Sequence, residues 1–333
     1  MKKRIVVAVV LAVLFALSST YAQTSGFLTL VRTGTAKSIQ AAIDQGAEVN
    51  ANGGTALIVA AQYNPNPEVI TILLNAGADI KLPDTMFGAY SLIIAAAKNP
   101  NPKVITVLVE AGADLDARGQ GGRTPLMDAL SSGKQSLKMI TTLLKAGADV
   151  NAQDEGGRTT LMGAGTLEAP GSSALIAILL KAGADLDARD SNGMTALMWA
   201  AKNNQNPEMI MALLKAGADI NAQEKGDPEA IILEYYIYMT PLMAAAESNQ
   251  NPDIITLLLK AGANLAARDD NGKTALMYAA AGNPNPDVIN RLLKADADTT
   301  AKDNKGKTAF DYAQANPSLK GTNAYRKLQE ASQ

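Results

Sequence analysis

Residues 195–219 read TALMWAAKNNQNPEMIMALLKAGAD, and the first seven of them have the pattern of a short helix. Thr195 is a favourable N-cap residue, because its side-chain oxygen can accept a hydrogen bond from a free N–H of the first turn. Leu197, Ala200 and Ala201 follow at the i, i+3, i+4 spacing of one buried helix face. The stretch therefore predicts a helix that begins just after Thr195.

The second half of this stretch predicts another helix. Residues 206–208, Asn-Pro-Glu, combine an N-cap residue, a proline suited to the first helical position and an acid that favours the positive helix end. Ile210, Leu213 and Leu214 form the expected inner stripe. Gly217 stands where this helix should end, since glycine readily takes the left-handed conformation of a C-terminal cap. Two short antiparallel helices result.

This pattern repeats along almost the whole chain. The key glycines lie at positions 46, 77, 112, 147, 183, 217 and 262, so their spacings are 31, 35, 35, 36, 34 and 45. Each unit opens with a Thr-Ala-Leu or Thr-Pro-Leu string or a variant of it, at Thr55, Tyr90, Thr124, Thr159, Thr195, Thr240 and Thr274. Repeats of this period are typical of a solenoid, in which each unit buries its apolar face against its neighbours.

These strings resemble the ankyrin repeat, in which a turn, Thr-Pro-Leu-His-x-Ala, a second helix and Gly-Ala-Asp follow one another. The resemblance implies an all-α solenoid of paired antiparallel helices with hairpin-like fingers between units. The chain departs from the pattern at the histidine that bridges backbone groups between units in that family. Its replacements are Ile58, Ile93, Met127, Met162, Met198, Met243 and Met277. We therefore expect a hydrophobic contact, rather than a hydrogen bond, at this position.

The chain is expected to contain a leader and one repeat domain. Residues 1–22 join a basic start, an apolar run too short to span a membrane well and a small-residue cleavage site, which is the order of a bacterial-type signal peptide. Retention as an uncleaved anchor is the alternative. The solenoid is then residues 23–333, with a degenerate first unit at 27–50, seven matching units from about 51–299, a C-terminal cap at 300–333 and an insertion at about 224–238. We expect export to the periplasm or outside the cell.

Composition excludes several functions. The chain contains 333 residues without Cys or His, so it can form neither a disulfide, a Cys/His zinc site nor a Ser-His-Asp triad. A net charge of -2 is unlike the basic excess of nucleic-acid binders. Adjacent acids such as Asp269-Asp270 lie in turns, where solvation is the ordinary state. We therefore expect no catalytic residues, no cofactor, no metal, no nucleic-acid partner and no membrane span after cleavage.

Helical geometry suggests where a partner could bind. With Leu197 toward the core and about 100° per residue, Trp199 points away from the core. Tyr278 and Asp128 occupy the equivalent position in other units, on the side of the first helix that the resemblance places in the concave groove. Trp and Tyr are common interface anchors. Two interpretations remain open: these side chains bind a partner and can be removed without harm to the fold, or neighbouring units merely cover them.

Two further surfaces are candidates. The residues that precede the opening threonine lie at the turn tips: Arg123, Arg158, Met194 and Lys273. The insertion carries Tyr235, Tyr236 and Tyr238 in an apolar stretch, which is unusual for a surface loop. It either contacts a partner, folds back on the array or has no role.

Together these observations predict a non-enzymatic, monomeric scaffold that binds an unknown protein in the cell envelope or outside the cell. A module that binds an envelope glycan or a small ligand is the alternative, with Trp199 and Tyr278 as stacking platforms.

Overall fold

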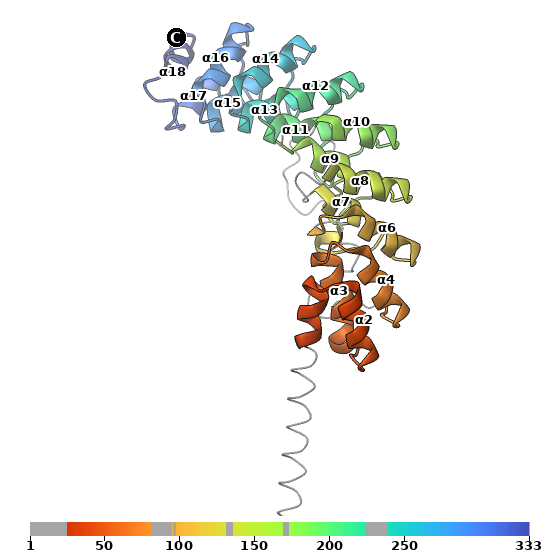
Figure 1. Cartoon of the computed structure of the whole chain (residues 1–333). Helices are drawn as coiled ribbons and strands as arrows, with labels where there is room; N and C mark the ends of the chain where they lie inside the picture. Colours follow the sequence, from red (N-terminus) through yellow and green to blue (C-terminus); the bar gives the residue numbers. More distant parts are fainter. Residues whose placement is uncertain are drawn as a thin grey trace, which may run out of the picture. The chain divides into compact units, whose positions relative to one another are not determined.

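The computed structural model describes residues 25–80, 95, 98–130, 136–168, 173–223 and 239–332 (Figure 1). Over these ranges the regular structure consists of α-helices and a 3-10 turn, with no strand. The all-α prediction is confirmed. The proposed signal peptide, residues 1–22, and the proposed insertion, about 224–238, lie outside the described residues.

The chain divides into two compact units, Met1–Asp149 and Val150–Gln333. In the first unit, residues 25–33 are helical, and the helices that follow form a row in which α2, α4, α6 and α8 pack in succession, while α3 and α7 pair with α4 and α8. Their bounds are α2 Ala36–Asp44, α3 Ala51–Tyr63, α4 Pro67–Asn75, α6 Pro102–Glu110, η1 Gln120–Gly122, α7 Pro125–Ala129 and α8 Ser136–Lys145.

The second unit has two layers of helices. The first helix of each pair packs against the next first helix, in the order α9, α11, α13, α15 and α17, and the second helices stack in the order α10, α12, α14, α16 and α18 (Figure 1). Their bounds are α9 Thr160–Gly165, α10 Ser173–Lys181, α11 Ala196–Asn203, α12 Pro207–Lys215, α13 Pro241–Ser248, α14 Pro252–Lys260, α15 Ala275–Gly282, α16 Pro286–Lys294, α17 Ala309–Ala313 and α18 Asn323–Glu330. Paired antiparallel helices are thus present as predicted.

The expected caps begin the helices. The Thr195 side chain accepts a hydrogen bond from the Met198 N–H, and the Asn206 side chain accepts one from the Glu208 N–H. The same threonine cap occurs at Thr124, Thr159, Thr240, Thr274 and Thr308, and the same Asn-Pro start at Asn66, Asn101, Asn251 and Asn285. These side chains satisfy N–H groups that a helix cannot satisfy internally.

Gly217 ends α12 as predicted. Its φ is 96°, a left-handed value that side-chain-bearing residues rarely adopt. The Ala218 N–H then donates back to the Leu213 carbonyl at 3.1 Å. This bond satisfies one of the carbonyls left free at the helix end.

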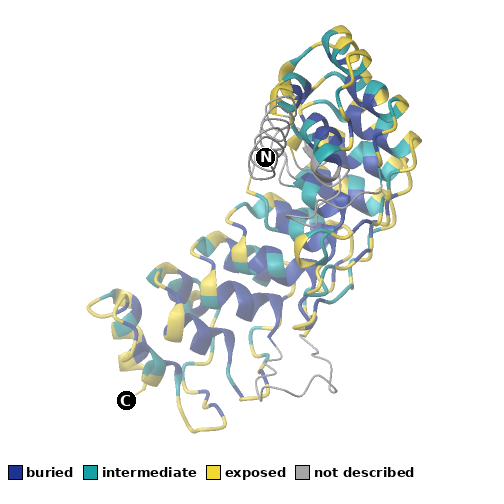
Figure 2. Ribbon diagram, turned by 90° about the horizontal axis from the view of Figure 1, so that it is seen from below, coloured by how far each residue is buried: buried dark blue, intermediate teal, exposed yellow. Residues whose placement is uncertain are grey.

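The core lies between the two helix layers within each unit, where the inner faces are buried (Figure 2). Leu197, at 1% exposure, confirms the predicted face of α11. The predicted stripe of α12 is partly wrong: Met209, Ile210 and Leu213 are buried, whereas Leu214 is half-buried. Leu214 is rotated by about 100° from Leu213, which places it at the edge of the stripe.

The methionines that replace the family's histidine are buried, as a hydrophobic role requires. At Met198 the sulfur also accepts a hydrogen bond from the Thr195 N–H at 3.4 Å. A thioether is only a weak acceptor, so this bond supplements the packing.

A ladder of buried asparagines, which the sequence analysis did not predict, links successive helix pairs. The Asn249 amide donates to the carbonyls of Ala201 at 2.8 Å and Asn204 at 2.9 Å, both in the preceding helix pair. Its oxygen accepts the Asn251 N–H at 2.9 Å. Asn64, Asn99, Asn204, Asn283 and Asn316 make the equivalent bonds. Each asparagine therefore fixes the register between consecutive pairs.

Candidate interaction surface

An aspartate organises the hairpin-like turn that precedes α11, residues 190–194, which we call its finger. Asp190 Oδ1 accepts the N–H groups of Asn192 and Met194, both at 2.9 Å. The Asp190 N–H donates to the Met194 carbonyl at 3.1 Å, and Gly193 supplies the positive φ of 77° that closes the turn. This hydrogen bonding orients the Asp190 carboxylate toward the start of the helix.

The second carboxylate oxygen of Asp190 binds Trp199. The Trp199 Nε1–H donates to Asp190 Oδ2 at 2.9 Å. The ring is half-buried and packs against Met194 and Met198, and the Arg158 guanidinium carbon lies 4.0 Å from the ring centroid. Trp199 is thereby held between a buried acid and an exposed cation.

The same arrangement recurs in two more helix pairs at the same sequence spacing. Tyr278 donates to Asp269 at 2.6 Å, and Tyr312 donates to Asp303, in each case nine residues after the aspartate. The spacing follows from the fold: the finger returns the chain to the helix start, and the aromatic residue lies about one turn into the helix, on the side that faces the finger.

Cations accompany these rings. The Lys273 ammonium lies 5.4 Å from the Tyr278 centroid and 4.8 Å from the Tyr312 centroid, so it contacts rings of two successive helix pairs. Lys307 lies 5.5 Å from the Tyr312 centroid. Distances below about 6 Å allow cation–π attraction. We use the name aromatic row for the pairs Asp190/Trp199, Asp269/Tyr278 and Asp303/Tyr312 together with the cations Arg158, Lys273 and Lys307.

Protonation at the C-terminal end of the aromatic row is shifted. Burial alone would raise the pKa of Asp303, but hydrogen bonds from Tyr312 and from the N–H groups of Lys305 and Lys307 lower it overall. Burial and the neighbouring Asp303 carboxylate raise the pKa of Tyr312. At neutral pH the pair is therefore a phenol that donates to a carboxylate.

One finger of the first unit uses different chemistry. Gly119 occupies the position of the finger aspartate, and Asp128 the position of the aromatic residue nine later. Arg123 Nε contacts Asp128 Oδ1 at 2.6 Å, and Arg123 Nη2 donates to the Met127 carbonyl at 2.8 Å. Arg123 and Asp128, both predicted as partner contacts, are thus bound to each other.

The other residues predicted to bind a partner differ in how far they are buried. The prediction that Tyr278 points away from the core is wrong: it is 5% exposed, because Asp269 holds its hydroxyl against the finger. Met194 is not a free turn tip, since it is 6% exposed and packs under Trp199. Arg158 is exposed and Lys273 half-buried. The tyrosines of the insertion, Tyr235, Tyr236 and Tyr238, lie outside the described residues.

Comparison with known families decides the classification. The sequence model of the ankyrin repeats, in three-copy form, matches residues 79–154, 153–224 and 229–323, and the single ankyrin repeat matches residues 52–85. The chain belongs to the ankyrin-repeat family. A search of curated proteins found no significant match. Ankyrin repeats are generally protein–protein interaction modules, and proteins built from them are typically non-enzymatic scaffolds.

Sequence reasoning missed several residues of the aromatic row in this ankyrin-repeat chain. Asp190, Asp269 and Asp303 were not recognised as partners of rings, and Tyr312 and Lys307 were not considered. The available signal was the recurrence of an aspartate nine residues before an aromatic residue. It was hidden because each aspartate, taken alone, has the appearance of an ordinary turn residue.

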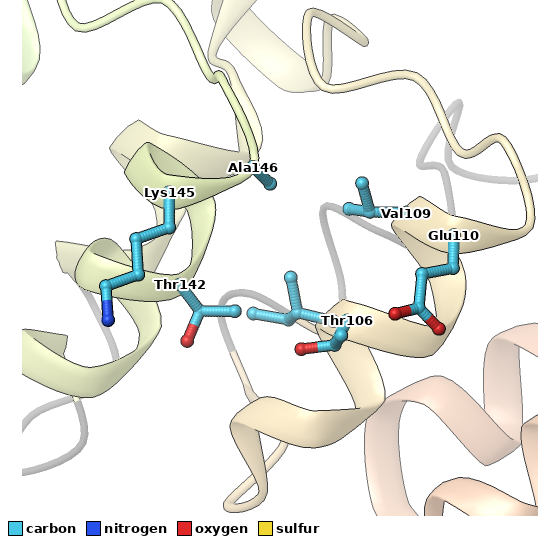
Figure 3. Close-up of a pocket in the computed structure, with 7 residues that line it drawn as sticks. Thr106, Val109, Glu110, Thr142, Lys145 and Ala146 are labelled. Atoms are coloured by element: carbon cyan, nitrogen blue, oxygen red, sulfur yellow. The ribbon is translucent and has the colours of Figure 1, made fainter.

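The first unit of the ankyrin-repeat chain also contains a groove between α6 and α8, of about 410 Å³ (Figure 3). Thr106, Val109 and Glu110 line it from α6, and Thr142 and Lys145 line it from α8. Ile105 and Ala146 complete its lining.

Two negative findings concern the described residues only. Within these ranges no three acidic side chains gather so that they could hold a metal ion. Over the same part of the ankyrin-repeat chain, no helix has the length and apolar character needed to cross a membrane.

Proposed function

We propose that this ankyrin-repeat chain is a non-enzymatic scaffold that binds another protein in the cell envelope or outside the cell. Support for protein binding comes from the general role of the family and from the aromatic row of the second unit. Support for export comes from residues 1–22, which have the composition and order of a signal peptide.

The observation that carries the proposal is the position of Arg158. Its side chain is exposed, yet its guanidinium is stacked 4.0 Å from the centroid of the Trp199 ring, which Asp190 holds in place. An arginine that is already ordered loses less conformational entropy when a partner binds. Arginine and tryptophan are also frequent among the residues that contribute most to protein interfaces. Arg158 is therefore a preorganised contact for a protein partner.

The alternative, a glycan or small-ligand module that stacks sugars on Trp199 and Tyr278, has less support. Stacking needs a free ring face. Tyr278 is buried, and one face of Trp199 is covered by Arg158 while the ring packs on Met194 and Met198. The aromatic row thus uses its rings to hold cations rather than to present open faces.

Crosslinking in the native host tests the proposal. The full chain with a C-terminal affinity tag is crosslinked in intact cells and recovered from separated envelope, extracellular and cytoplasmic fractions. Arg158→Glu is compared with Lys320→Glu, a charge reversal of an exposed lysine outside the aromatic row. We expect one protein to be recovered with the parent chain and with Lys320→Glu, but not with Arg158→Glu, in an envelope or extracellular fraction.

Two outcomes contradict the proposal. Recovery that is equal for both variants would show that Arg158 is not part of the interface. Recovery of the chain only from the cytoplasm, with Met1 still present by mass spectrometry, would exclude the proposed location.

A further inference from the structure

The finger before α9 is built in the same way as the fingers of the aromatic row. Asp154 Oδ1 accepts the N–H groups of Gly156 and Arg158, both at 2.9 Å. The Asp154 N–H donates to the Arg158 carbonyl at 3.0 Å. The Asp154 carboxylate therefore has the same backbone partners, at the same relative positions, as the Asp190 carboxylate.

This finger lacks the aromatic residue that the others have. Nine residues after Asp154 the chain has Gly163, so α9 supplies no ring. Among the described residues, none donates a hydrogen bond to Asp154 Oδ2, although Asp154 is half-buried. In the three fingers of the aromatic row the corresponding oxygen accepts a ring N–H or O–H.

The finger before α9 also carries a cation, Arg158. Arg158 follows Asp154 by four residues, as Lys273 follows Asp269. Lys273 lies between the ring of its own helix pair and the ring of the next, at 5.4 and 4.8 Å from their centroids. Among the described residues, Arg158 contacts one ring, that of Trp199 in the next helix pair. In the aromatic row, the other ring comes from the residue nine positions after the aspartate. Here that residue is Gly163, which has no side chain.

We propose that Asp154 Oδ2, Arg158 and the backbone of α9 at Gly163 form a site for one aromatic side chain of the protein partner, a tryptophan or tyrosine. The partner's ring N–H or O–H donates to Asp154 Oδ2, and the ring meets the Arg158 guanidinium. A phenylalanine fits less well, because it has no donor for the carboxylate. The inference rests on the proposed function, since it specifies the chemistry of the same interface.

Binding of indole tests this site without knowledge of the partner. Indole has the ring and N–H of tryptophan, whereas 1-methylindole has the ring without the donor. Each is titrated into the ¹⁵N-labelled full chain, and the amide signals of Gly156 and Arg158, which bond to Asp154 Oδ1, are followed. We expect saturable shifts of both amides with indole, and binding at least about tenfold weaker with 1-methylindole, since a hydrogen bond to a charged group is lost.

Asp154→Asn is the matched variant. Its side-chain oxygen can still accept the two backbone N–H groups, but a donor replaces Oδ2. We expect the preference for indole over 1-methylindole to disappear. Equal binding of the two probes by the parent chain, a preference that persists in Asp154→Asn, or the absence of saturable shifts at Gly156 and Arg158 would each overturn the inference.

A second variant supplies the ring within the chain. Gly163→Trp places an indole nine residues after Asp154, as Trp199 is placed after Asp190, and should abolish indole binding. Failure of the indole experiments together with Arg158-dependent recovery of a protein would reject the aromatic site alone. Indole binding without any Arg158-dependent partner would instead reject the proposed function.

Discussion

Trp199 and Asp190 are nine residues apart and are joined by a hydrogen bond of 2.9 Å between Nε1 and Oδ2. Asp190 is only 6% exposed, so its carboxylate depends on protein donors in place of water. This relationship makes Trp199 part of the structure of its finger, in addition to any role in binding. The expectation that Trp199 could be removed without effect on the fold therefore has to be revised.

Trp199→Phe should lower the free energy of unfolding by about 1–3 kcal/mol, because Asp190 Oδ2 is left without its donor. Urea denaturation followed by circular dichroism measures the change. In a chain that already carries Asp190→Asn, the same substitution should have a smaller effect. Strictly additive effects of the two substitutions would show that the hydrogen bond contributes nothing.

Removal of an asparagine from the ladder should lower the free energy of unfolding more than Trp199→Phe does. Asn249 is fully buried and makes two hydrogen bonds to carbonyls of the preceding helix pair. Asn249→Ala leaves these buried carbonyls unpaired and should cost about 3 kcal/mol or more. Asn203→Ala is the control, since the exposed Asn203 makes a single bond to the Trp199 carbonyl and should change stability by less than about 0.5 kcal/mol. Similar losses for both variants would contradict the account of the ladder.

A substitution in α9 should raise stability. Thr160 is 1% exposed, and its hydroxyl has no hydrogen-bond partner in the described part of the chain. Thr160→Val keeps the branched shape and removes the unpaired group, so we expect a gain of about 1 kcal/mol. The adjacent Thr159→Val removes an N-cap and should instead lose about 1 kcal/mol. Thermal unfolding measures both changes: the midpoint should be higher than that of the parent for Thr160→Val and lower for Thr159→Val. A lower midpoint for Thr160→Val would contradict the prediction.

The Asp303–Tyr312 pair predicts a defined dependence on pH. The pKa of Asp303 is below its ordinary value of 3.8, so its contribution is present above pH 3.8 and is lost as the pH falls through its folded value. The pKa of Tyr312 is above its ordinary value of 10.0, so its contribution is present below pH 10.0 and is lost as the pH rises further. The difference in unfolding free energy between the parent and Tyr312→Phe should therefore be constant, at about 1 kcal/mol, from about pH 5 to 9.

That difference should shrink on both the acidic and the alkaline side. Denaturant titrations of the parent and Tyr312→Phe at several pH values measure it. A difference that grows as the pH falls below 3.8 would show that the hydrogen bond is not the source of the shift in Asp303.

The fold could be predicted from the sequence because its signals are local and repeated. Thr195, Asn206 and Gly217 each act within one helical turn. Equivalent residues recur in most helix pairs, so a helix boundary that is ambiguous in one pair can be read from the others. The predicted stripe of α12 was wrong at Leu214 because a sequence pattern shows which face is apolar but not how deeply its edge is covered.

The candidate site was less predictable from the sequence, because its contacts join a finger to the helix that follows it, or one helix pair to the next. An angular count on one helix placed Tyr278 away from the core, but the count does not include the finger, whose Asp269 binds the hydroxyl. The ladder of Asn249 was missed for the same reason, since its acceptors lie 45 and 48 residues away in the sequence. Contacts of this kind become visible only when the helix pairs are stacked.

The central claim is that Arg158, held on Trp199, contacts a protein partner. The most direct measurement is a calorimetric titration of the purified partner against three forms of the chain, namely the parent, Arg158→Glu and Lys320→Glu. A cost of about 2 kcal/mol at a central contact corresponds to an affinity roughly 30-fold weaker for Arg158→Glu, whereas Lys320→Glu should bind as the parent does. Equal affinity of all three forms, with unchanged circular dichroism, would contradict the claim.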